Sequence, residues 1–290
     1  MFDVAIIGTG PAGISAALNL KLHNKNIIWF GSDELSNKVQ KSEKIANYPG
    51  FYCVIGNELN KQFQSQISSM GLDICDKRVT AITKRRKGFM LMAENEIYEA
   101  KTVLLAIGVV SAKGFKGEQD LLGYGVSYCA TCDGFLYKGK TIAVFCGNKK
   151  FEHEVAYLAE LADKVYLQTG YSDCEIDLPN VEKLPKSIKT VLGDKFVNAI
   201  ELADGSVISV DGVFCLRNAV APTTLLPGLE MDGVHIAVDR SNQNTNISGC
   251  FAAGDCTGRP YQIAKAIGEG NIAAHSIVEY LSDKEMNVCK

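Results

Sequence analysis

The chain has 290 residues, of which 47% are hydrophobic and 22% are charged, a composition typical of a folded globular protein with about two domains. It carries 33 acidic and 30 basic residues, a net charge of -3, which gives no reason to expect nucleic acid or an anionic membrane as a partner. The ten cysteines are irregularly spaced in a long chain, so a reducing cytoplasm fits better than the disulfide framework of a small secreted protein.

The N-terminus runs from a short apolar stretch, residues 3–7, directly into a glycine-rich loop. It lacks the basic segment that opens a signal peptide, so we expect a first strand there. No apolar run in the sequence reaches the length of a membrane span. These features predict a cytoplasmic protein that does not enter a membrane.

The first strand, the loop and the residues that follow form a βαβ pattern. The loop is Gly8-Thr9-Gly10-Pro11-Ala12-Gly13, residues 14–22 have helical spacing, and residues 26–30 form a second strand. In this context the G-x-G-x-x-G spacing predicts a dinucleotide site, because the glycines admit a pyrophosphate to the backbone and the helix N-terminus supplies amide donors. Asp33 and Glu34, after the second strand, are candidates for the acid that binds a ribose hydroxyl.

The next part of the chain predicts a helix over residues 57–70, an antiparallel meander over 78–100, and a buried strand over 102–107 that ends in Gly108. A run of four basic residues, Lys84 to Lys87, falls in a turn of the meander. Such a run is usually a solvated tip, and docking of an acidic partner is the functional alternative.

Cys129-Ala130-Thr131-Cys132-Asp133 is the strongest chemical signal in the chain. A C-x-x-C pair predicts disulfide chemistry, because its environment can lower the pKa of one thiol and make a thiolate at neutral pH. The carboxylate of Asp133 could then carry the proton. A structural zinc site would need a second ligand pair, and the four histidines stand apart in sequence, so we expect no metal; they are His23, His153, His235 and His275.

A second strand–loop–helix–strand pattern covers residues 141–168. Its loop, Cys146-Gly147-Asn148-Lys149-Lys150-Phe151, places side chains where a pyrophosphate needs close approach to the backbone. No arginine follows the second strand at Thr169-Gly170-Tyr171-Ser172 to receive a 2′-phosphate. We expect the folding unit to be kept and its nucleotide site to be lost.

The last third predicts a strand that ends in Gly254-Asp255, followed by a helix over residues 262–280. An aspartate at the end of a strand can hydrogen-bond the ribityl chain of a flavin, while the N-terminus of the following helix faces the isoalloxazine. The alternative is a simple N-cap aspartate.

Together these segments resemble the low-molecular-weight thioredoxin reductases, across nearly the whole chain. The matching motifs are Gly8 to Gly13, Asn47-Tyr48-Pro49-Gly50, Ala106-Ile107-Gly108, Cys129 to Gly134, and Ala253-Gly254-Asp255 with Gln262-Ile263. The resemblance implies an α/β, two-domain flavoprotein disulfide reductase with two Rossmann-like nucleotide-binding domains, the central one inserted into the FAD domain. It implies an FAD domain at 1–114 and 244–290, and a central domain at 115–243. The residues expected to bind FAD are Gly8, Gly10, Pro11, Ala12, Gly13, Asp33, Glu34, Asn47, Ala106, Gly108, Gly254, Asp255, Gln262 and Ile263.

The departures from this family concentrate on NADPH contacts. The NADPH loop is altered, the H-R-R-x-x-F-R segment has no arginine here, and the I-G-x-x-P-N-T stretch appears as residues 216–224. The G-G-Q loop that usually touches FAD is Ser36-Asn37-Lys38, which puts that contact in doubt. This pattern is similar to the ferredoxin-dependent flavin thioredoxin reductases.

That resemblance implies a reaction sequence. Ferredoxin delivers electrons to FAD, the reduced flavin reduces the Cys129–Cys132 disulfide, and the dithiol reduces thioredoxin, with Cys132 facing the flavin, Cys129 attacking thioredoxin and Asp133 as general acid/base. A homodimer is also implied. Because ferredoxins are typically acidic, the basic run 84–87 or the pair Lys149 and Lys150 are candidate docking contacts.

Three other interpretations remain open. The protein could bind a pyridine nucleotide in an altered way, or hold a second flavin in the vacated site, as in diflavin disulfide oxidoreductases. It could also be a non-catalytic, flavin-binding regulator. The retained Cys129, Cys132 and Asp133 argue against that last interpretation.

Overall fold

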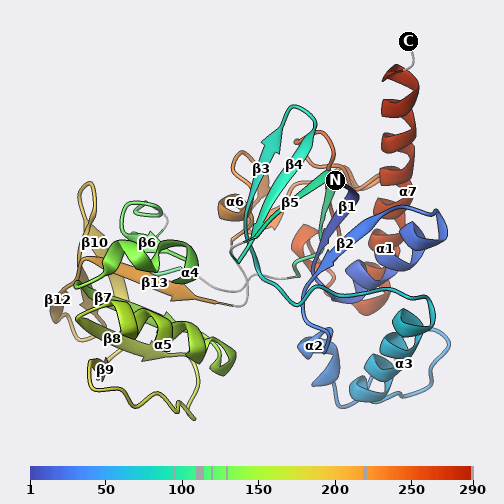
Figure 1. Ribbon diagram of the computed structural model, residues 1–290. Coiled ribbons are helices and arrows are strands. Elements are labelled where there is room, and N and C mark those ends of the chain that lie inside the picture. The colour runs from blue at the N-terminus through green and yellow to red at the C-terminus, as the bar shows by residue number, and fades with distance from the viewer. Residues whose placement is uncertain (95, 109–113, 119, 129, 218–220, 289–290) are drawn as a thin grey trace. The chain divides into compact units, whose positions relative to one another are not determined.

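The computed structural model describes residues 1–94, 96–108, 114–118, 120–128, 130–217 and 221–288, with the backbone alone at 37, 132 and 285–288. The chain forms two compact units, 1–110 with 221–290, and 111–220 (Figure 1). The middle of the chain is therefore an insertion into a unit built from both ends. The domain limits expected from the sequence, 114/115 and 243/244, remain predictions.

The first unit is a six-stranded mixed sheet with helices. Its sheet runs β2-β1-β5-β4-β3, and β16 also pairs with β5. The strands are β1 (Phe2–Ile7), β2 (Ile27–Phe30), β3 (Val79–Arg85), β4 (Gly88–Ala93), β5 (Glu96–Leu105) and β16 (Cys250–Ala252), with the small pair β14 (Met231–Asp232) and β15 (His235–Ile236). The helices are α1 (Pro11–Leu22), α2 (Asn37–Gln40), α3 (Gly56–Ser69), α6 (Pro222–Leu225) and α7 (Ile263–Val288), with the short 3₁₀ turn η3 (Asp255–Thr257).

The expected meander is present in β3, β4 and the first half of β5, but its last strand is continuous with the expected buried strand. The sequence predicted a meander that ended at 100 and a separate buried strand at 102–107, but β5 runs unbroken through both. Its first half pairs antiparallel with β4, and its second half pairs parallel with β1 and β16. The sequence Ala100-Lys101-Thr102 contains no turn-forming residue that would end the strand. Thr102, where the pairing of β5 changes from antiparallel to parallel, donates from its Oγ1 to Asp3 O in β1 at 2.8 Å.

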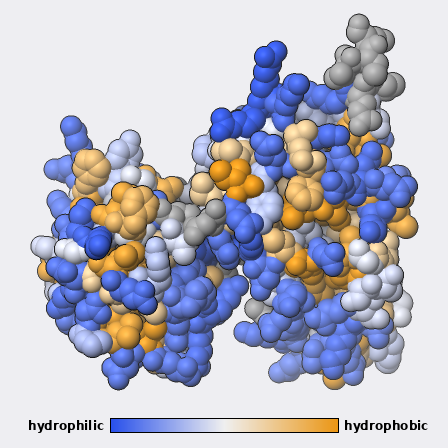
Figure 2. All heavy atoms as spheres, viewed as in Figure 1, coloured by the Kyte–Doolittle hydropathy of each residue, from blue (hydrophilic) through white to orange (hydrophobic). Residues whose placement is uncertain are grey.

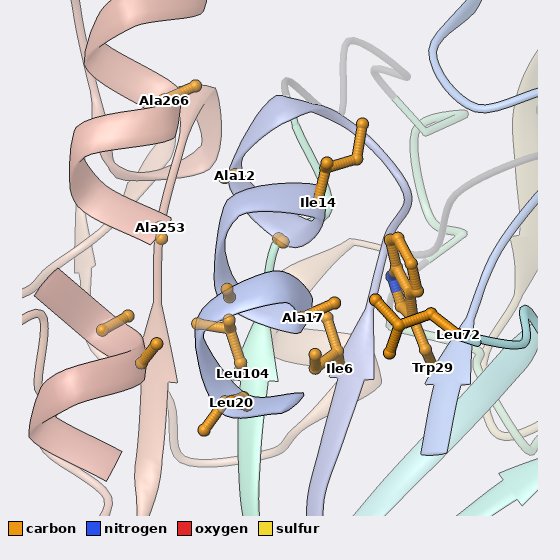
Figure 3. Close-up of a cluster of buried hydrophobic side chains, with 14 of the residues drawn as sticks. Ile6, Ala12, Ile14, Ala17, Leu20, Trp29, Leu72, Leu104, Ala253 and Ala266 are labelled. Carbon is orange, nitrogen blue, oxygen red and sulfur yellow. The ribbon is translucent and has the colours of Figure 1, made fainter. Parts of the chain in front are cut away.

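The hydrophobic core of this unit lies where α1 packs on the sheet and along α7 (Figure 3). Leu20, Leu104 and Phe251 are fully buried, and burying each such side chain stabilises the fold by about 1.5–3 kcal/mol. Trp29 is also buried, and its Nε1 donates to Gly8 O at 2.9 Å. The core therefore reaches directly to the backbone of the glycine loop.

The second unit is built on a five-stranded parallel sheet in the order β6-β13-β7-β8-β9. A three-stranded antiparallel sheet, β10-β11-β12, accompanies it. The strands are β6 (Val126–Ser127), β7 (Thr141–Cys146), β8 (Lys164–Thr169), β9 (Val181–Lys183), β10 (Ile188–Gly193), β11 (Val197–Leu202), β12 (Val207–Ser209) and β13 (Gly212–Leu216). The helical segments are α4 (Ala130–Asp133), η1 (Gly134–Tyr137), η2 (Lys149–Phe151) and α5 (Glu152–Leu161).

Each unit presents a mostly hydrophilic surface on the face that Figure 2 shows, broken by smaller hydrophobic patches. Among the described residues, no helix is both long enough and apolar enough to cross a membrane. The longest helix, α7, has 26 residues and carries charged side chains along its length.

Candidate functional site

The glycine loop joins β1 to α1 with close backbone contacts. Gly8 has φ +114°, and a Cβ on it would lie 2.2 Å from Ala106 O. A Cβ on Gly13 would lie 2.0 Å from Gly8 O, so only glycine lets α1 pack this closely on the strand. Gly10, the N-cap of α1, makes no side-chain cap and has no atom within 4 Å of an added Cβ. The start of α1 therefore offers amide donors beside open space, which fits a pyrophosphate.

Asp33 and Glu34 lie in the turn after β2, and α3 holds that turn in place. Asn60 Nδ2 donates to Glu34 O at 2.9 Å, and Gln64 Nε2 donates to Asp33 O at 3.1 Å. These bonds use the backbone carbonyls, and both acidic residues are exposed. The carboxylates stand at the position expected for recognition of a ribose hydroxyl.

Other expected contacts come together from distant parts of the chain. Asn47 Nδ2 donates to Gln262 Oε1 at 2.6 Å, and Ile263 begins α7 and packs against the core. Gly108 follows β5 with φ +67° and has no atom within 4 Å of an added Cβ. Open space thus adjoins Gly10 after β1 and Gly108 after β5.

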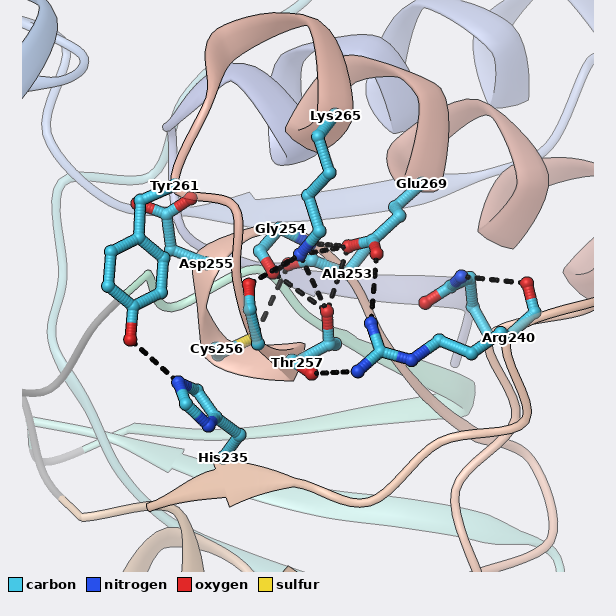
Figure 4. A network of polar contacts seen from close by, with 12 residues as sticks. His235, Arg240, Ala253, Gly254, Asp255, Cys256, Thr257, Tyr261, Lys265 and Glu269 are labelled. Carbon is cyan, nitrogen blue, oxygen red and sulfur yellow. Dashed lines mark hydrogen bonds and ion pairs between the residues drawn. The ribbon is translucent and has the colours of Figure 1, made fainter. Parts of the chain in front are cut away.

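Asp255 begins the short turn η3 shortly after β16, and a partly buried ion pair holds this turn (Figure 4). Lys265 Nζ donates to Gly254 O at 2.7 Å and forms an ion pair with Glu269 at 2.9 Å. Glu269 in turn accepts from Gly254 N at 2.9 Å and from Thr257 Oγ1 at 2.8 Å. The carboxylate of Asp255 accepts from Lys38 Nζ at 2.6 Å, which argues against the simple N-cap interpretation.

The dithiol segment is described in part. Cys129 lies outside the described residues, and the backbone of Cys132 lies in α4, whereas its side chain is outside the description. Asp133 ends α4, and its Oδ2 accepts from Ser127 Oγ at 2.6 Å. Burial raises the pKa of Tyr137, and the charge of Asp133 adds to that shift. The hydrogen bond from Ser127, which is buried, holds the Asp133 carboxylate in one orientation.

The other buried cysteines are unsuited to nucleophilic chemistry. Burial raises the pKa of Cys250 and of Cys256 to about 12. Burial also raises the pKa of Cys215 well above its ordinary value. These three thiols remain protonated at neutral pH.

In the second unit, an acidic residue in the first turn of α5 bonds to the segment that follows β8. Glu152 begins α5, and its Oε1 accepts from Tyr171 OH at 2.8 Å and from Glu175 N at 3.1 Å. Although burial raises its pKa, these hydrogen bonds lower the pKa of Glu152 overall, so the group is ionised at neutral pH. Lys149 forms ion pairs with Glu175 at 2.6 Å and Asp173 at 3.3 Å. The first turn of this helix thus carries a negative charge that the segment after β8 holds in place.

Arg217 follows β13 beside the same altered loop, since its Cα lies 3.7 Å from a Cβ built on Gly147. Its guanidinium lies beside two aromatic rings, 4.8 Å from the centre of Phe115 and 4.9 Å from that of Phe145. It also forms an ion pair with Glu118, which is only 1% exposed. The altered I-G-x-x-P-N-T stretch therefore contributes a buried cation rather than a glycine.

The basic run occupies the β3–β4 turn, and Lys84 anchors one side of it. Lys84 Nζ donates to Ser248 O at 2.7 Å and lies 4.1 Å from the centre of the Phe89 ring. Burial lowers the pKa of Lys84. Ser248 precedes β16, whereas Gly254 and Asp255 follow it. The basic turn thus lies near the start of this strand, and the candidate flavin residues lie beyond its end.

Two of the histidines that stand apart in sequence meet in space. The rings of His23 and His275 are 5.1 Å apart in an edge-to-face contact. Within the described residues, no three histidine, cysteine, aspartate or glutamate side chains gather as a metal site would require.

Several residues at these sites were not identified from the sequence: Lys38, Glu118, Glu152, Tyr171, Arg217, Lys265 and Glu269. The Lys265–Glu269 pair had a usable signal, an i,i+4 spacing of opposite charges in an expected helix. Glu152 had another, an acidic residue at the start of an expected helix. The remaining contacts join residues too distant in sequence for any local pattern to indicate.

Comparison with known proteins places these features in context. Residues 2–167 match the model of the pyridine nucleotide-disulphide oxidoreductase family. A thioredoxin reductase of Helicobacter pylori is 33% identical, over 97% of this chain and 99% of its own. A crystal structure of a ferredoxin-flavin thioredoxin reductase from Clostridium acetobutylicum is 44% identical with a TM-score of 0.90, covering 98% of this chain and 99% of its own. A thioredoxin reductase from Gloeobacter violaceus is 27% identical with a TM-score of 0.79, covering 97% and 94%.

Proposed function

Because the chain belongs to the pyridine nucleotide-disulphide oxidoreductase family and acts on a disulfide, we propose that it reduces thioredoxin with electrons from reduced ferredoxin. The family resemblance and the two-domain flavoprotein disulfide reductase fold expected from the sequence are confirmed. The electron donor, the identity of the flavin as FAD and the individual site residues are parts of the proposal.

The observation that carries the choice of donor is the carboxylate of Glu152 at the N-terminus of α5. A pyrophosphate brought to the start of α5 would meet a like charge in the first turn of that helix, and Arg217 lies beside Gly147 in the loop that precedes it. The crystal structure that is 44% identical to this chain is of a ferredoxin-flavin thioredoxin reductase. Both findings support a donor other than NADPH.

The first unit has the residues to hold FAD. Gly10 and the amides of α1 would bind the pyrophosphate, Asp33 or Glu34 the ribose, and Asp255 the ribityl chain. When bound, FAD supplies a group that can join a one-electron carrier to a two-electron disulfide. We assign FAD binding to residues 1–114 with 244–290, and the dithiol to residues 115–243.

In this proposal Cys132, Cys129 and Asp133 of the dithiol segment have separate roles in disulfide reduction. Cys132 faces the flavin, Cys129 attacks the thioredoxin disulfide, and Asp133, oriented by Ser127, moves the proton. The next residues, Phe135 and Leu136, are 62% and 54% exposed, which supports docking of another protein beside the dithiol. We further propose that the protein acts in the cytoplasm and as a homodimer, as the family resemblance implies.

The test is an anaerobic absorbance experiment on the purified protein. NADPH, NADH or enzymatically reduced ferredoxin is added, and oxidised thioredoxin follows. We expect ferredoxin alone to bleach the flavin and thioredoxin to restore the colour. Rapid bleaching by NADPH would contradict the proposed donor, and failure of thioredoxin to restore the colour would favour the non-catalytic regulator.

A further inference from the structure

Lys38 places a positive charge at the candidate flavin site, at the position where the resembling reductases have the glutamine of their G-G-Q loop. Its Nζ lies 2.6 Å from Asp255 Oδ2 and 5.1 Å from the centre of the Tyr261 ring. We propose that Lys38 is a positioning residue that raises the reduction potential of bound FAD by offsetting the charge of Asp255. The inference rests on the proposed function, since it requires FAD at this site.

The backbone of Lys38 is fixed although its side chain is 66% exposed. Val39, the next residue, is buried in the core, and its N–H donates to Ser36 Oγ at 3.3 Å. Ser42 Oγ donates to Lys38 O at 3.0 Å, and Gly56 N donates to Ser42 O at 2.8 Å. The short helix α2 therefore presents this lysine from a supported position.

Asp255 is equally fixed, and its side chain is only 14% exposed. The ion pair of Lys265 with Glu269 holds the turn that carries it (Figure 4). Tyr261, over which the ammonium lies, is itself oriented by a hydrogen bond of 2.7 Å between its hydroxyl and His235 Nε2. The backbone of Lys38 and the carboxylate of Asp255 are thus both supported by neighbouring contacts, and the Lys38 ammonium contacts both Asp255 and the Tyr261 ring.

The electrostatic consequence concerns the electrons that the flavin takes up. A carboxylate near a flavin repels added negative charge, and a paired cation cancels that repulsion. Glutamine at position 38 would leave the charge of Asp255 uncompensated, because its amide carries no charge. An acceptor between ferredoxin and a disulfide needs a potential between the two, so the charge at this position bears directly on the proposed reaction.

The test compares the midpoint potential of bound FAD in the wild type, Lys38→Gln, Lys38→Arg and Lys41→Gln, by anaerobic spectroscopic titration against reference dyes. Lys41 is an exposed lysine just past α2 and serves as the matched control. We expect Lys38→Gln to retain FAD and to lower the ratio of reduced to oxidised flavin about tenfold at a given potential, which is about 30 mV for a two-electron couple. Lys38→Arg and Lys41→Gln keep the wild-type potential.

Equal potentials in the wild type and Lys38→Gln would overturn the inference. Loss of FAD from Lys38→Gln alone would also overturn it, because Lys38 would then hold the cofactor rather than set its potential. A wild-type protein that binds no FAD would instead refute the proposed function. An FAD-containing wild type that reduces thioredoxin, with no effect of Lys38→Gln on the potential, would refute this inference alone.

Discussion

In the second unit, a single substitution can change the free energy of unfolding strongly, because two of its charged side chains are almost fully removed from solvent. Glu118 is 1% exposed and Arg217 is 10% exposed, and Tyr128 OH donates a further bond of 2.7 Å to Glu118. Removal of one partner from such a pair leaves the other charge desolvated and uncompensated. The same ion pair on the surface would contribute little.

The variant Arg217→Met should therefore lower the free energy of unfolding of this unit by about 3–5 kcal/mol. The control is Lys189→Met, which breaks the exposed 2.7 Å pair with Glu201 and should cost at most about 1 kcal/mol. Urea unfolding followed by circular dichroism measures both. Equal losses in the two variants would contradict the role of burial.

A second residue-scale prediction concerns Asp133. Asp133→Asn keeps the hydrogen-bond acceptor for Ser127 but cannot take up a proton, so kcat for thioredoxin reduction should fall about 10²- to 10⁴-fold. Asp211→Asn is the control, since that carboxylate accepts from Thr141 N at 2.9 Å and has no place in the proposed reaction. Wild-type kcat in Asp133→Asn would exclude it as the general acid/base.

At the scale of elements, two glycines at the junction of β1 and α1 have different roles, one in helix packing and one in the proposed ligand binding. Gly10 and Gly13 belong to one motif, yet an added Cβ meets open space at Gly10 and Gly8 O at 2.0 Å at Gly13. The first glycine leaves room for the cofactor, and the second lets the helix pack on the strand.

Alanine substitutions should separate these two roles. Gly10→Ala should leave the melting temperature of the FAD-free protein unchanged, because its φ of -75° suits alanine, while the affinity for FAD falls. Gly13→Ala should lower the stability of the FAD-free protein by about 1–3 kcal/mol or more, through overpacking. Thermal melts with and without FAD distinguish the two, and the same pattern in both variants would contradict the assignment.

The join between β1, β2 and β5 should be sensitive to acid. Asp3 forms an ion pair with Lys101 at 2.8 Å and accepts from Asn26 N at 2.9 Å. Burial raises its pKa, but the contacts with Lys101 and Asn26 outweigh burial and leave the pKa of Asp3 lowered. A lowered pKa stabilises the fold above the unfolded-state value, about 3.9, and this stabilisation is lost as the pH falls through the folded-state pKa.

Asp3→Asn should consequently lower the urea midpoint at pH 7, and its difference from the wild type should shrink as the pH falls from 5 toward 2. Midpoints measured at several pH values check the sign. A difference that grew in acid would mean that Asp3 is not stabilised in its charged form.

For the whole molecule, the two Rossmann-like folds differ at the loop that precedes the first helix of each. The first keeps an open glycine loop at the start of α1, and the second has a carboxylate at the start of α5. The same architecture thus leaves open space at the glycine loop of one unit, the proposed FAD site, and places an acidic residue in the first helical turn of the other.

This division predicts one FAD for each chain, because Glu152 disfavours a second pyrophosphate. Release of the flavin from pure protein, with its absorbance compared with the protein concentration, gives the ratio. Two flavins for each chain would favour the diflavin interpretation and would contradict this prediction.

The sequence by itself determined the family, the βαβ units, the intact first glycine loop and the altered second one. The βαβ units and the two loops depend on local periodicity and on glycine spacing, which can be found in a sequence without its fold. The family came from the resemblance of its motifs, Cys129 to Gly134 among them. The end of α7 was predicted too early. The expected helix stopped at residue 280, whereas α7 continues to Val288. No glycine or proline follows residue 280 in the sequence to end the helix.

Only the tertiary structure decided which distant residues meet. Lys38 reaches Asp255 across 217 positions, and Arg217 reaches Glu118 across 99. It also put the basic run of 84–87 near the start of β16, away from the residues expected to hold FAD. These outcomes follow from strand order and packing, and strand pairing between segments far apart in the chain leaves no local pattern from which they could be inferred.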